Sequence, residues 1–145
     1  MNSATDPLKR FVDAQDRDYA RALAELEAGR KRSHWMWYVL PQLVELGRSQ
    51  TARAYGIKGR SEAESYFAHS ILGPRLVASV IAILRHSDRS ALDILGEIDA
   101  LKFKSCLTLF TTVAPDEPVF TRALAVFYQG QPDHETLRLL GEIAK

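Results

Sequence analysis

Glycines and prolines divide the chain into short segments, and within each segment apolar residues recur at the three- and four-residue spacing of one helix face. The first segment begins at Asp6-Pro7, which is typical of a helix start, and ends at Gly29. Apolar and polar residues nowhere alternate for long enough to predict a strand, although Val39 and residues 107–113 have a β-like composition. The pattern predicts an all-α fold of seven to nine mostly short helices.

The later helices are expected to start at capping residues, whose side chains accept hydrogen bonds from the free N–H groups of a first helical turn. The expected N-caps are Ser33, Ser49, Ser61, Ser90 and Asp133. Pro41 lacks a backbone donor and disfavours helix at the residue before it, so we expect it to divide residues 35–46 into two short helices. Pro74 is expected to open a central helix over residues 75–86.

A longer helix is expected from Ile98 to about Val113, where Pro115 follows. Its apolar residues recur at helical spacing, which predicts that they face the core: Ile98, Leu101, Cys106, Leu109 and Phe110. Asp99, Lys102 and Ser105 are spaced by three and therefore share a neighbouring face. These polar residues form either a surface ion pair of little energetic weight or a partly buried group whose pKa values shift.

Length and composition predict one helical domain over residues 1–145, with residues 1–6 as a flexible N-terminus. The 19 basic and 18 acidic side chains leave a net charge of +1, so we expect neither a nucleic acid nor a membrane as partner. The N-terminal residues lack the apolar run of a signal peptide, and the longest apolar run is too short to span a bilayer. The cytoplasm is therefore the expected compartment.

The usual signatures of enzyme chemistry are missing: there is no phosphate loop, no dinucleotide fingerprint and no nucleophile elbow. The 4 histidines are scattered and do not have the spacing of metal ligands. The single cysteine, Cys106, lies among apolar residues at helical spacing, which favours a buried thiol over a nucleophile. We therefore predict no metal site and no cofactor, and the sequence leaves open whether the protein is an enzyme.

Residues 31–42, which read KRSHWMWYVLPQ, combine both tryptophans with polar groups more densely than any other segment, so we expect the other helices to pack around them. Trp35 and Trp37 point to different sides of a helix, so one could line a pocket for a planar ligand while the other packs in the core. His34 is either an acid, base or anion contact or a histidine bonded to a helix end. Lys31 is either part of a small anion site or a solvated loop residue.

Three further polar positions lie on or beside apolar helix faces. Gln15 falls on the stripe of the first helix, where it has a buried partner, lines a polar cavity or lies at the edge of the stripe. Glu62 and Tyr66 share one face of another helix. Arg75 is expected in a first helical turn, where the helix dipole disfavours a cation unless it pairs with an anion. Arg75 is therefore a candidate clamp for a carboxylate or phosphate.

These residues resemble those of a helical family, the domain-of-unknown-function family numbered 1810. The similarity covers nearly the whole chain. It is carried by Phe11, Gln15 and Tyr19, by Gly29 to Trp37, by Pro41-Gln42, by Tyr55-Gly56, by Glu62-Ala63, by Tyr66, by Leu72 to Leu76, by Asp99, Lys102 and Ser105, and by Thr108 to Phe110. The resemblance implies a compact all-α fold. Some members carry the label calpastatin, but this sequence has no inhibitory repeat and no disordered composition.

A more distant similarity links the chain to a helical superfamily proposed to process NAD and ADP-ribose derivatives, through the spacing of Glu62 and Tyr66 beside a tryptophan-rich segment. This similarity implies a nucleotide-like ligand, bound or hydrolysed in a pocket built on residues 34–37. The candidate catalytic residues are Glu62, Asp99 and His34. The candidate ligand-binding residues are Gln15, Lys31, Trp35, Trp37, Gln42, Tyr66, Arg75, Lys102 and Ser105.

Two other interpretations stay open. The protein could be a non-catalytic interaction module, or a homodimer, that docks through the tryptophan segment, because tryptophan is frequent at the centre of interfaces. Alternatively, the polar residues could form a satisfied structural network that determines how the short helices meet.

Overall fold

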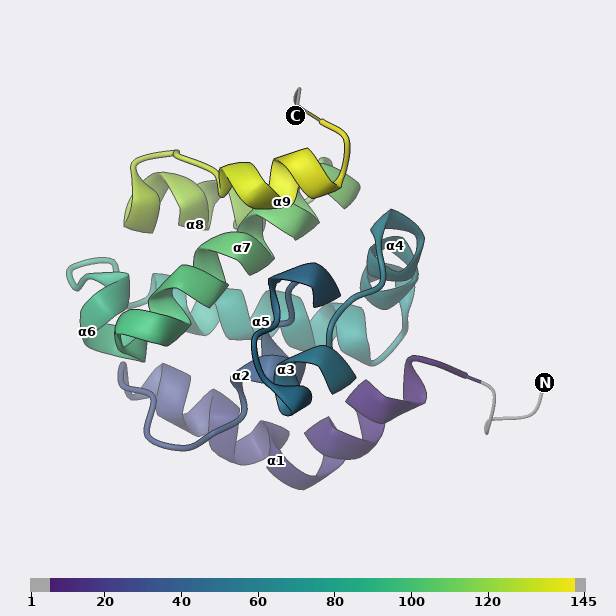
Figure 1. The fold of residues 1–145 in the computed structure, drawn as a ribbon. Helices are drawn as coiled ribbons and strands as arrows, with labels where there is room; N and C mark the ends of the chain where they lie inside the picture. Colours follow the sequence, from purple (N-terminus) through teal and green to yellow (C-terminus); the bar gives the residue numbers. More distant parts are fainter. Residues whose placement is uncertain (1–5, 143–145) are drawn as a thin grey trace.

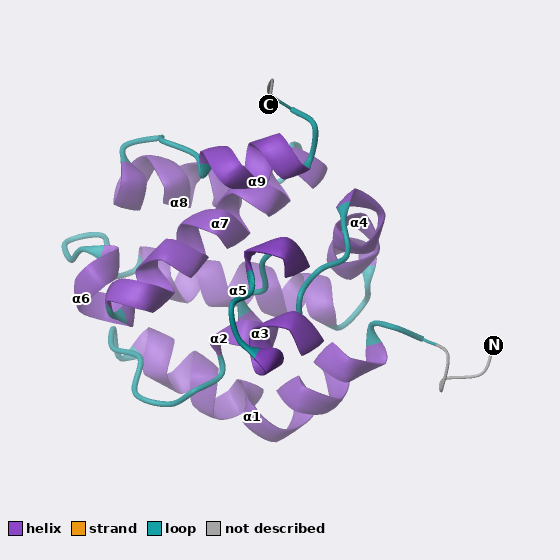
Figure 2. Ribbon diagram, in the orientation of Figure 1, coloured by secondary structure: helices purple, strands orange, loops and turns teal. Residues whose placement is uncertain are grey.

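The structure, a computed structural model, describes residues 6–142 and is all-α, as predicted (Figures 1 and 2). Its elements within that range are α1 (Lys9–Glu27), α2 (Met36–Val39), the 3-10 helix η2 (Val44–Leu46), α3 (Gln50–Ala54), α4 (Arg60–Ala68), α5 (Leu72–Leu84), α6 (Ala91–Leu95), α7 (Glu97–Val113), α8 (Pro118–Tyr128) and α9 (His134–Leu139). Most of the expected flexible N-terminus lies outside the described residues. Asp6 is described, and its Oδ1 accepts a hydrogen bond from the Leu8 amide at 2.9 Å.

Helix α5 lies at the centre of the bundle, as its apolar composition predicts. It packs against α1, α4 and α8, and α2 contacts it as well. In Figure 1, α1 lies below α5, while α7 crosses in front and leads to α8 and α9 at the top. Leu76, Val80 and Ile83 on α5 are fully or almost fully buried. The hydrophobic effect of this burial holds the shorter helices around α5.

Three of the five expected N-caps are confirmed. The side chains of Ser49, Ser90 and Asp133 accept hydrogen bonds from the backbone amides at the starts of α3, α6 and α9. The predictions for Ser33 and Ser61 are wrong. Helix α2 begins after Trp35, and Ser33 binds Glu25 instead, whereas α4 already begins at Arg60, so Ser61 lies inside it.

The prediction of a second short helix after Pro41 is also wrong, because the only helical turn described there is η2. Leu43 is extended and forms an isolated parallel bridge with Ile57. The Val44 amide donates to the Ile57 carbonyl, and the Ile57 amide donates to the Gln42 carbonyl, both at 2.9 Å. Tertiary pairing therefore replaces the local helix and brings the two ends of the η2–α3 segment together.

Of the five apolar residues of α7 that are predicted to face the core, three do and two do not. Cys106, Leu109 and Phe110 are completely buried, but Ile98 is 70% exposed and Leu101 is 67% exposed. In the N-terminal half, the side of α7 that carries Phe103 packs against Phe127 and Tyr128 of α8, whereas the side that carries Ile98 and Leu101 lines an open groove. Burial thus depends on which sides of α7 other helices cover, which local periodicity does not reveal.

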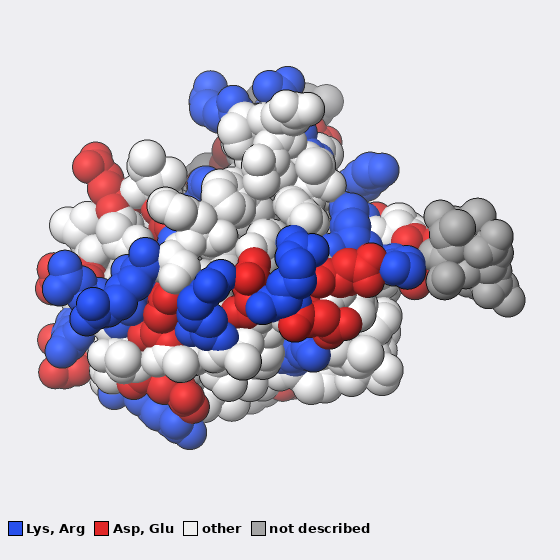
Figure 3. All heavy atoms as spheres, turned by 90° about the horizontal axis from the view of Figure 1, so that it is seen from below, with Lys and Arg blue, Asp and Glu red and all other residues white. Residues whose placement is uncertain are grey.

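The outer face of α1 carries charges of both signs (Figure 3). Lys9 pairs with Asp13 at 2.7 Å, and Arg21 pairs with Asp18 at 2.8 Å. Basic and acidic side chains are interspersed on this face instead of gathering into a patch of one sign. Within residues 6–142 no single helix is both long and apolar enough to cross a membrane, although α4 and α5 meet that criterion as a pair bent by 86°.

Gly73 allows the sharp corner between α4 and α5. Helix α5 begins at Leu72, two residues before Pro74, so the expected start at the proline is slightly late. A Cβ atom on Gly73 would lie 2.1 Å from the carbonyl oxygen of Phe67, closer than any real contact. The absence of a side chain therefore permits the 86° bend.

We expect Gly73→Ala to lower the free energy of unfolding by about 1–3 kcal/mol, because the new methyl group forces the corner apart. Urea denaturation followed by circular dichroism measures the change. Ser65→Ala, an exposed substitution on α4, is the control and should change stability by less than about 0.5 kcal/mol. Equal stabilities of the Gly73→Ala and wild-type proteins would contradict the close packing at this corner.

Candidate functional site

The carboxylate of Glu25 organises the loop that forms the first part of the tryptophan segment, residues 31–42. Its Oε1 accepts hydrogen bonds from the backbone amides of Arg32 at 2.8 Å and Ser33 at 3.0 Å, and from the Trp35 indole at 2.9 Å. Its Oε2 accepts a further bond from the Ser33 hydroxyl. One side chain of α1 therefore sets both the loop conformation and the position of the indole, which is completely buried.

Burial alone would raise the pKa of the Glu25 carboxyl, but the hydrogen bonds from Ser33, Arg32 and Trp35 outweigh it and lower the pKa from 4.5 to about 2. The donors stabilise the ionised form, which accepts from all of them at once. The folded protein therefore favours the charged carboxylate, whose contribution to stability is full above pH 4.5 and is lost as the pH falls toward 2.

Lys31 connects this loop to α7. Its ammonium lies 2.9 Å from Asp99 Oδ2 and 5.1 Å from the centre of the Trp35 ring, and it also donates to the Ser33 carbonyl. Only 7% of its side chain is exposed. Lys31 is therefore held among its partners and does not extend from a solvated loop.

Lys102 lies on the other side of Asp99. Its ammonium is 3.9 Å from Asp99 Oδ1 and 5.5 Å from the centre of the Trp37 ring. Asp99 thus faces two cations but is in closer contact with Lys31. The Trp37 ring is half-buried beneath Lys102, so the ring positions the ammonium and does not present an open stacking face.

An open groove of about 490 Å³ lies between the η2–α3 segment and the N-terminal half of α7. Its lining residues are Gln42, Leu46, Arg48, Ser49, Ala52, Ile98, Leu101, Lys102, Ser105 and Asp133. Three of the predicted ligand-binding residues, Gln42, Lys102 and Ser105, meet here. A narrow hollow that also touches Gln42 and Lys102 extends to Trp37, but its volume of about 10 Å³ leaves room for no more than a water molecule.

Gln15, Tyr66 and Arg75 form a separate cluster among α1, α4 and α5. Gln15 Nε2 donates to the Tyr38 carbonyl at 2.6 Å and to the Tyr66 hydroxyl at 2.9 Å, and both side chains are buried. Arg75 Nη1 lies 3.5 Å from Gln15 Oε1, and its guanidinium pairs with Asp16 at 3.4 Å. Gln15 therefore has the buried partners that its position on the stripe requires, and none of the three residues lines the groove.

The three candidate catalytic residues belong to different surroundings. Glu62 pairs with Arg10 at 2.8 Å and accepts from the Lys58 amide at 3.1 Å. Asp99 lies between Lys31 and Lys102, as described above, and the exposed His34 ring is 6.5 Å from the Trp37 ring. None of the three lines the groove. Within residues 6–142, no three histidine, cysteine or acidic side chains come together as metal ligands.

The sequence did not single out Glu25, Leu46 or Arg48. Glu25 lies between apolar positions of α1 and reads as a solvated acid, and its role requires a loop that folds back onto α1. Arg48 follows Gly47 in an irregular segment, where no periodicity indicates its neighbours. It forms no ion pair with any other residue of the described chain.

The family described as Protein of unknown function (DUF1810) matches residues 5–140. The chain belongs to this family. A crystal structure of the conserved hypothetical protein Rv1873 from Mycobacterium tuberculosis is similar, with 44% sequence identity and a TM-score of 0.91. The similarity covers 92% of this chain and 96% of that one. No curated protein matches the chain. The resemblance to DUF1810 is thus confirmed, and the similarity to proteins that process NAD or ADP-ribose stays a prediction.

We expect Glu25→Gln to lower the free energy of unfolding by about 1–3 kcal/mol above pH 5, because an amide cannot accept from all four donors. The pKa of Glu25 in the folded state is depressed. The contribution of the carboxylate to the free energy of unfolding is therefore fully present above pH 4.5 and is lost as the pH falls toward 2. The stability difference from wild type should therefore shrink across that interval. Tryptophan fluorescence during urea denaturation at several pH values measures it.

Glu27→Gln is the matched control. Glu27 lies on the same helix, its side chain is about half exposed, and its one ion pair among the described residues, with the exposed Arg85, is long at 3.8 Å. It should change stability by less than about 0.5 kcal/mol at every pH. A stability difference for Glu25→Gln that is independent of pH would contradict the role of the charged carboxylate.

Proposed function

We propose that the groove between α3 and α7 binds a small anionic ligand with an apolar, planar part, of the nucleotide or ADP-ribose type. The observation that carries this proposal is the pairing of two cations with an open apolar wall. Lys102 and Arg48 line the same groove as Leu46, Ile98 and Leu101. Sites for small molecules have this composition, an apolar surface with a few polar groups, at volumes of roughly 300–1,000 Å³.

The charges of the groove support an anion. Asp99 is in closer contact with Lys31, at 2.9 Å, than with Lys102, at 3.9 Å, so it neutralises Lys102 only in part. Arg48 has no carboxylate partner among residues 6–142. The one acidic residue of the groove, Asp133, uses its Oδ2 to cap α9 through Thr136. A phosphate or diphosphate that lies between Lys102 and Arg48 would satisfy both cations.

The remaining groups suit the rest of such a ligand. A nucleobase or a nicotinamide ring could lie on Ile98 and Leu101, which are exposed at 70% and 67% and gain burial from it. The amide of Gln42 can donate to and accept from the edge of a base. In this arrangement Trp37 acts through Lys102 and does not stack on the ligand.

The proposal is for binding without cleavage. Glycosidic cleavage requires a carboxylate that reaches the sugar. Glu62 is paired with Arg10, and Asp99 is paired with Lys31, and neither carboxylate lines the groove. Incubation with NAD should therefore release no nicotinamide.

Titration calorimetry with ADP-ribose, NAD, AMP and adenosine tests the proposal. We expect the phosphate-bearing compounds to bind more tightly than adenosine, because only they meet the two cations. Lys102→Gln and Arg48→Gln should each weaken ADP-ribose binding about tenfold or more, which corresponds to the loss of one hydrogen bond to a charged group.

Arg53→Gln is the matched control, since Arg53 is an exposed arginine of α3 that does not line the groove. It should leave the affinity unchanged. No binding of any phosphate-bearing compound at millimolar concentration would contradict the proposal. Equal affinities for the wild type and Lys102→Gln would show that the ligand lies elsewhere.

The exposure of Ile98 and Leu101 also favours a second candidate function, a protein-interaction module that forms a homodimer. Exposed apolar residues that adjoin a groove are typical of contact surfaces. The tryptophan segment contributes little to this surface, because Trp35 is buried and Trp37 is half-buried.

If α7 mediates self-association, the mass measured by light scattering should rise with protein concentration, and Ile98→Ser should weaken the rise. Leu92→Ser is the matched control, because Leu92 is 56% exposed on α6 but does not line the groove. A monomer at every concentration would exclude the homodimer.

A further inference from the structure

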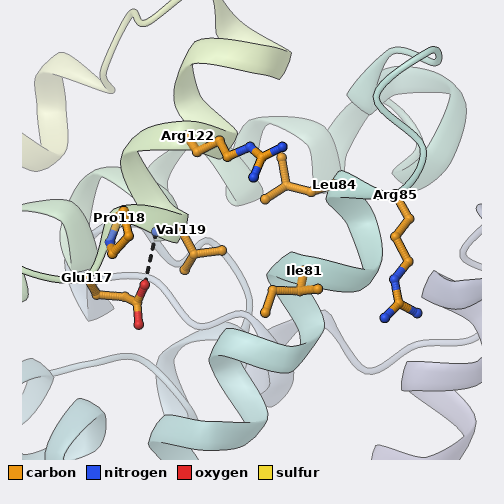
Figure 4. Close-up of a pocket in the computed structure, with 7 residues that line it drawn as sticks. All are labelled: Ile81, Leu84, Arg85, Glu117, Pro118, Val119 and Arg122. Atoms are coloured by element: carbon orange, nitrogen blue, oxygen red, sulfur yellow. Dashed lines mark hydrogen bonds between the residues drawn. The ribbon is translucent and has the colours of Figure 1, made fainter.

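A second cleft, of about 480 Å³, lies between α5 and α8 (Figure 4). It is lined by Ile81, Leu84, Arg85, Glu117, Pro118, Val119 and Arg122, and it shares no residue with the groove between α3 and α7. Its volume falls within the range of roughly 300–1,000 Å³ that is usual for small-molecule sites. The two clefts are therefore separate candidate sites.

The floor of the α5–α8 cleft is aliphatic. Figure 4 shows Ile81 and Leu84 on α5 facing Val119 at the start of α8. Ile81 is 41% exposed, which is unusual for an isoleucine on the central helix, whereas Val119 is mostly buried. Apart from its charged residues the lining is aliphatic, so the floor offers apolar contact along the length of a hydrocarbon chain.

One cation of the cleft has no partner. Arg122 extends from α8 toward Leu84, and it forms no hydrogen bond or ion pair with the other described residues (Figure 4). Arg85 is less available, because it faces Glu27 at 3.8 Å across a solvated surface. The guanidinium of Arg122 therefore stands over the aliphatic floor with its donors free.

The cleft also contains one acid, which limits the charge of a ligand. Glu117 Oε2 accepts a hydrogen bond from the Val119 amide at 3.1 Å and caps α8, so its negative charge stays at one end of the cleft. A dianionic phosphate would bring two negative charges to the single cation Arg122 and would meet repulsion from this carboxylate, whereas the groove between α3 and α7 offers two cations. A single negative charge can pair with Arg122 and remain apart from Glu117.

We propose that the α5–α8 cleft binds an aliphatic monocarboxylate, with its carboxylate on Arg122 and its chain on Ile81, Leu84 and Val119. Arginine binds a carboxylate through two parallel hydrogen bonds, which fixes the orientation of the head group. The chain removes Ile81 from water and supplies the apolar part of the binding free energy.

The test is a titration of isotope-labelled protein with octanoate below its micelle-forming concentration, followed by nuclear magnetic resonance. We expect saturable shifts of the backbone amides of Leu84, Val119 and Arg122. Octanol and octyl phosphate should each bind about tenfold more weakly than octanoate, because the first lacks the charge and the second faces Glu117.

Two variants separate the head group from the chain. Arg122→Gln should weaken octanoate binding about tenfold and bring its affinity close to that of octanol. Ile81→Asp should abolish octanoate binding, because it places a negative charge on the floor. Leu92→Asp is the matched control, since Leu92 is an exposed apolar residue of α6 outside the cleft, and it should bind octanoate like the wild type.

The absence of saturable shifts would overturn the proposal. Shifts centred on Ile98 and Leu101 would also overturn it, because they would place the chain in the other groove. Equal affinities for octanoate and octanol, or for the wild type and Arg122→Gln, would show that Arg122 does not hold the carboxylate.

Discussion

The course of the chain between α1 and α2 depends on one carboxylate. Glu25 accepts hydrogen bonds from two backbone amides, a hydroxyl and an indole N–H, all from residues 32–35. A loop of this kind has donors that no helix or strand satisfies, and burying them without partners would be costly. Because Glu25 supplies those partners, the chain can reverse direction after α1 and place Trp35 in the core.

The position of Trp35 then determines the polar groups above it. Lys31 lies over the Trp35 ring and reaches Asp99, and Asp99 also faces Lys102, which lies over Trp37. This chain of alternating charges and rings joins the N-terminal loop to α7. It accounts for the position of the Lys102 ammonium at the edge of the groove, where a ligand could meet it. A cation held over an aromatic face loses little further freedom when it binds an anion.

Helix content followed from periodicity and capping because both depend on neighbours within a few residues. Ser49, Ser90 and Asp133 show this, since each caps the helix that begins directly after it.

The site depends on contacts between residues far apart in the chain. Gln42, Lys102 and Ser105 were predicted to bind a ligand and do line one groove, but Gln15, Tyr66 and Arg75 form a separate, internally bonded cluster. Periodicity marks a polar residue on an apolar face without showing which residue it will contact. The exposure of Ile98 and Leu101 had no local signal, because it reflects where the other helices end.

Arg10 links one wall of the groove between α3 and α7 to helix α1. Its guanidinium, on α1, donates to the carbonyl oxygens of Ala54 at 3.0 Å and Gly56 at 2.8 Å, and it pairs with Glu62. Helix α3 has 5 residues and is too short to be stable alone, so this arginine holds its C-terminal end. One wall of the groove is thus attached to α1, and the opposite wall is α7. Thermal fluctuations that tilt α1 relative to α7 would widen or narrow the groove, so its width is coupled to the motion of a helix that does not line it.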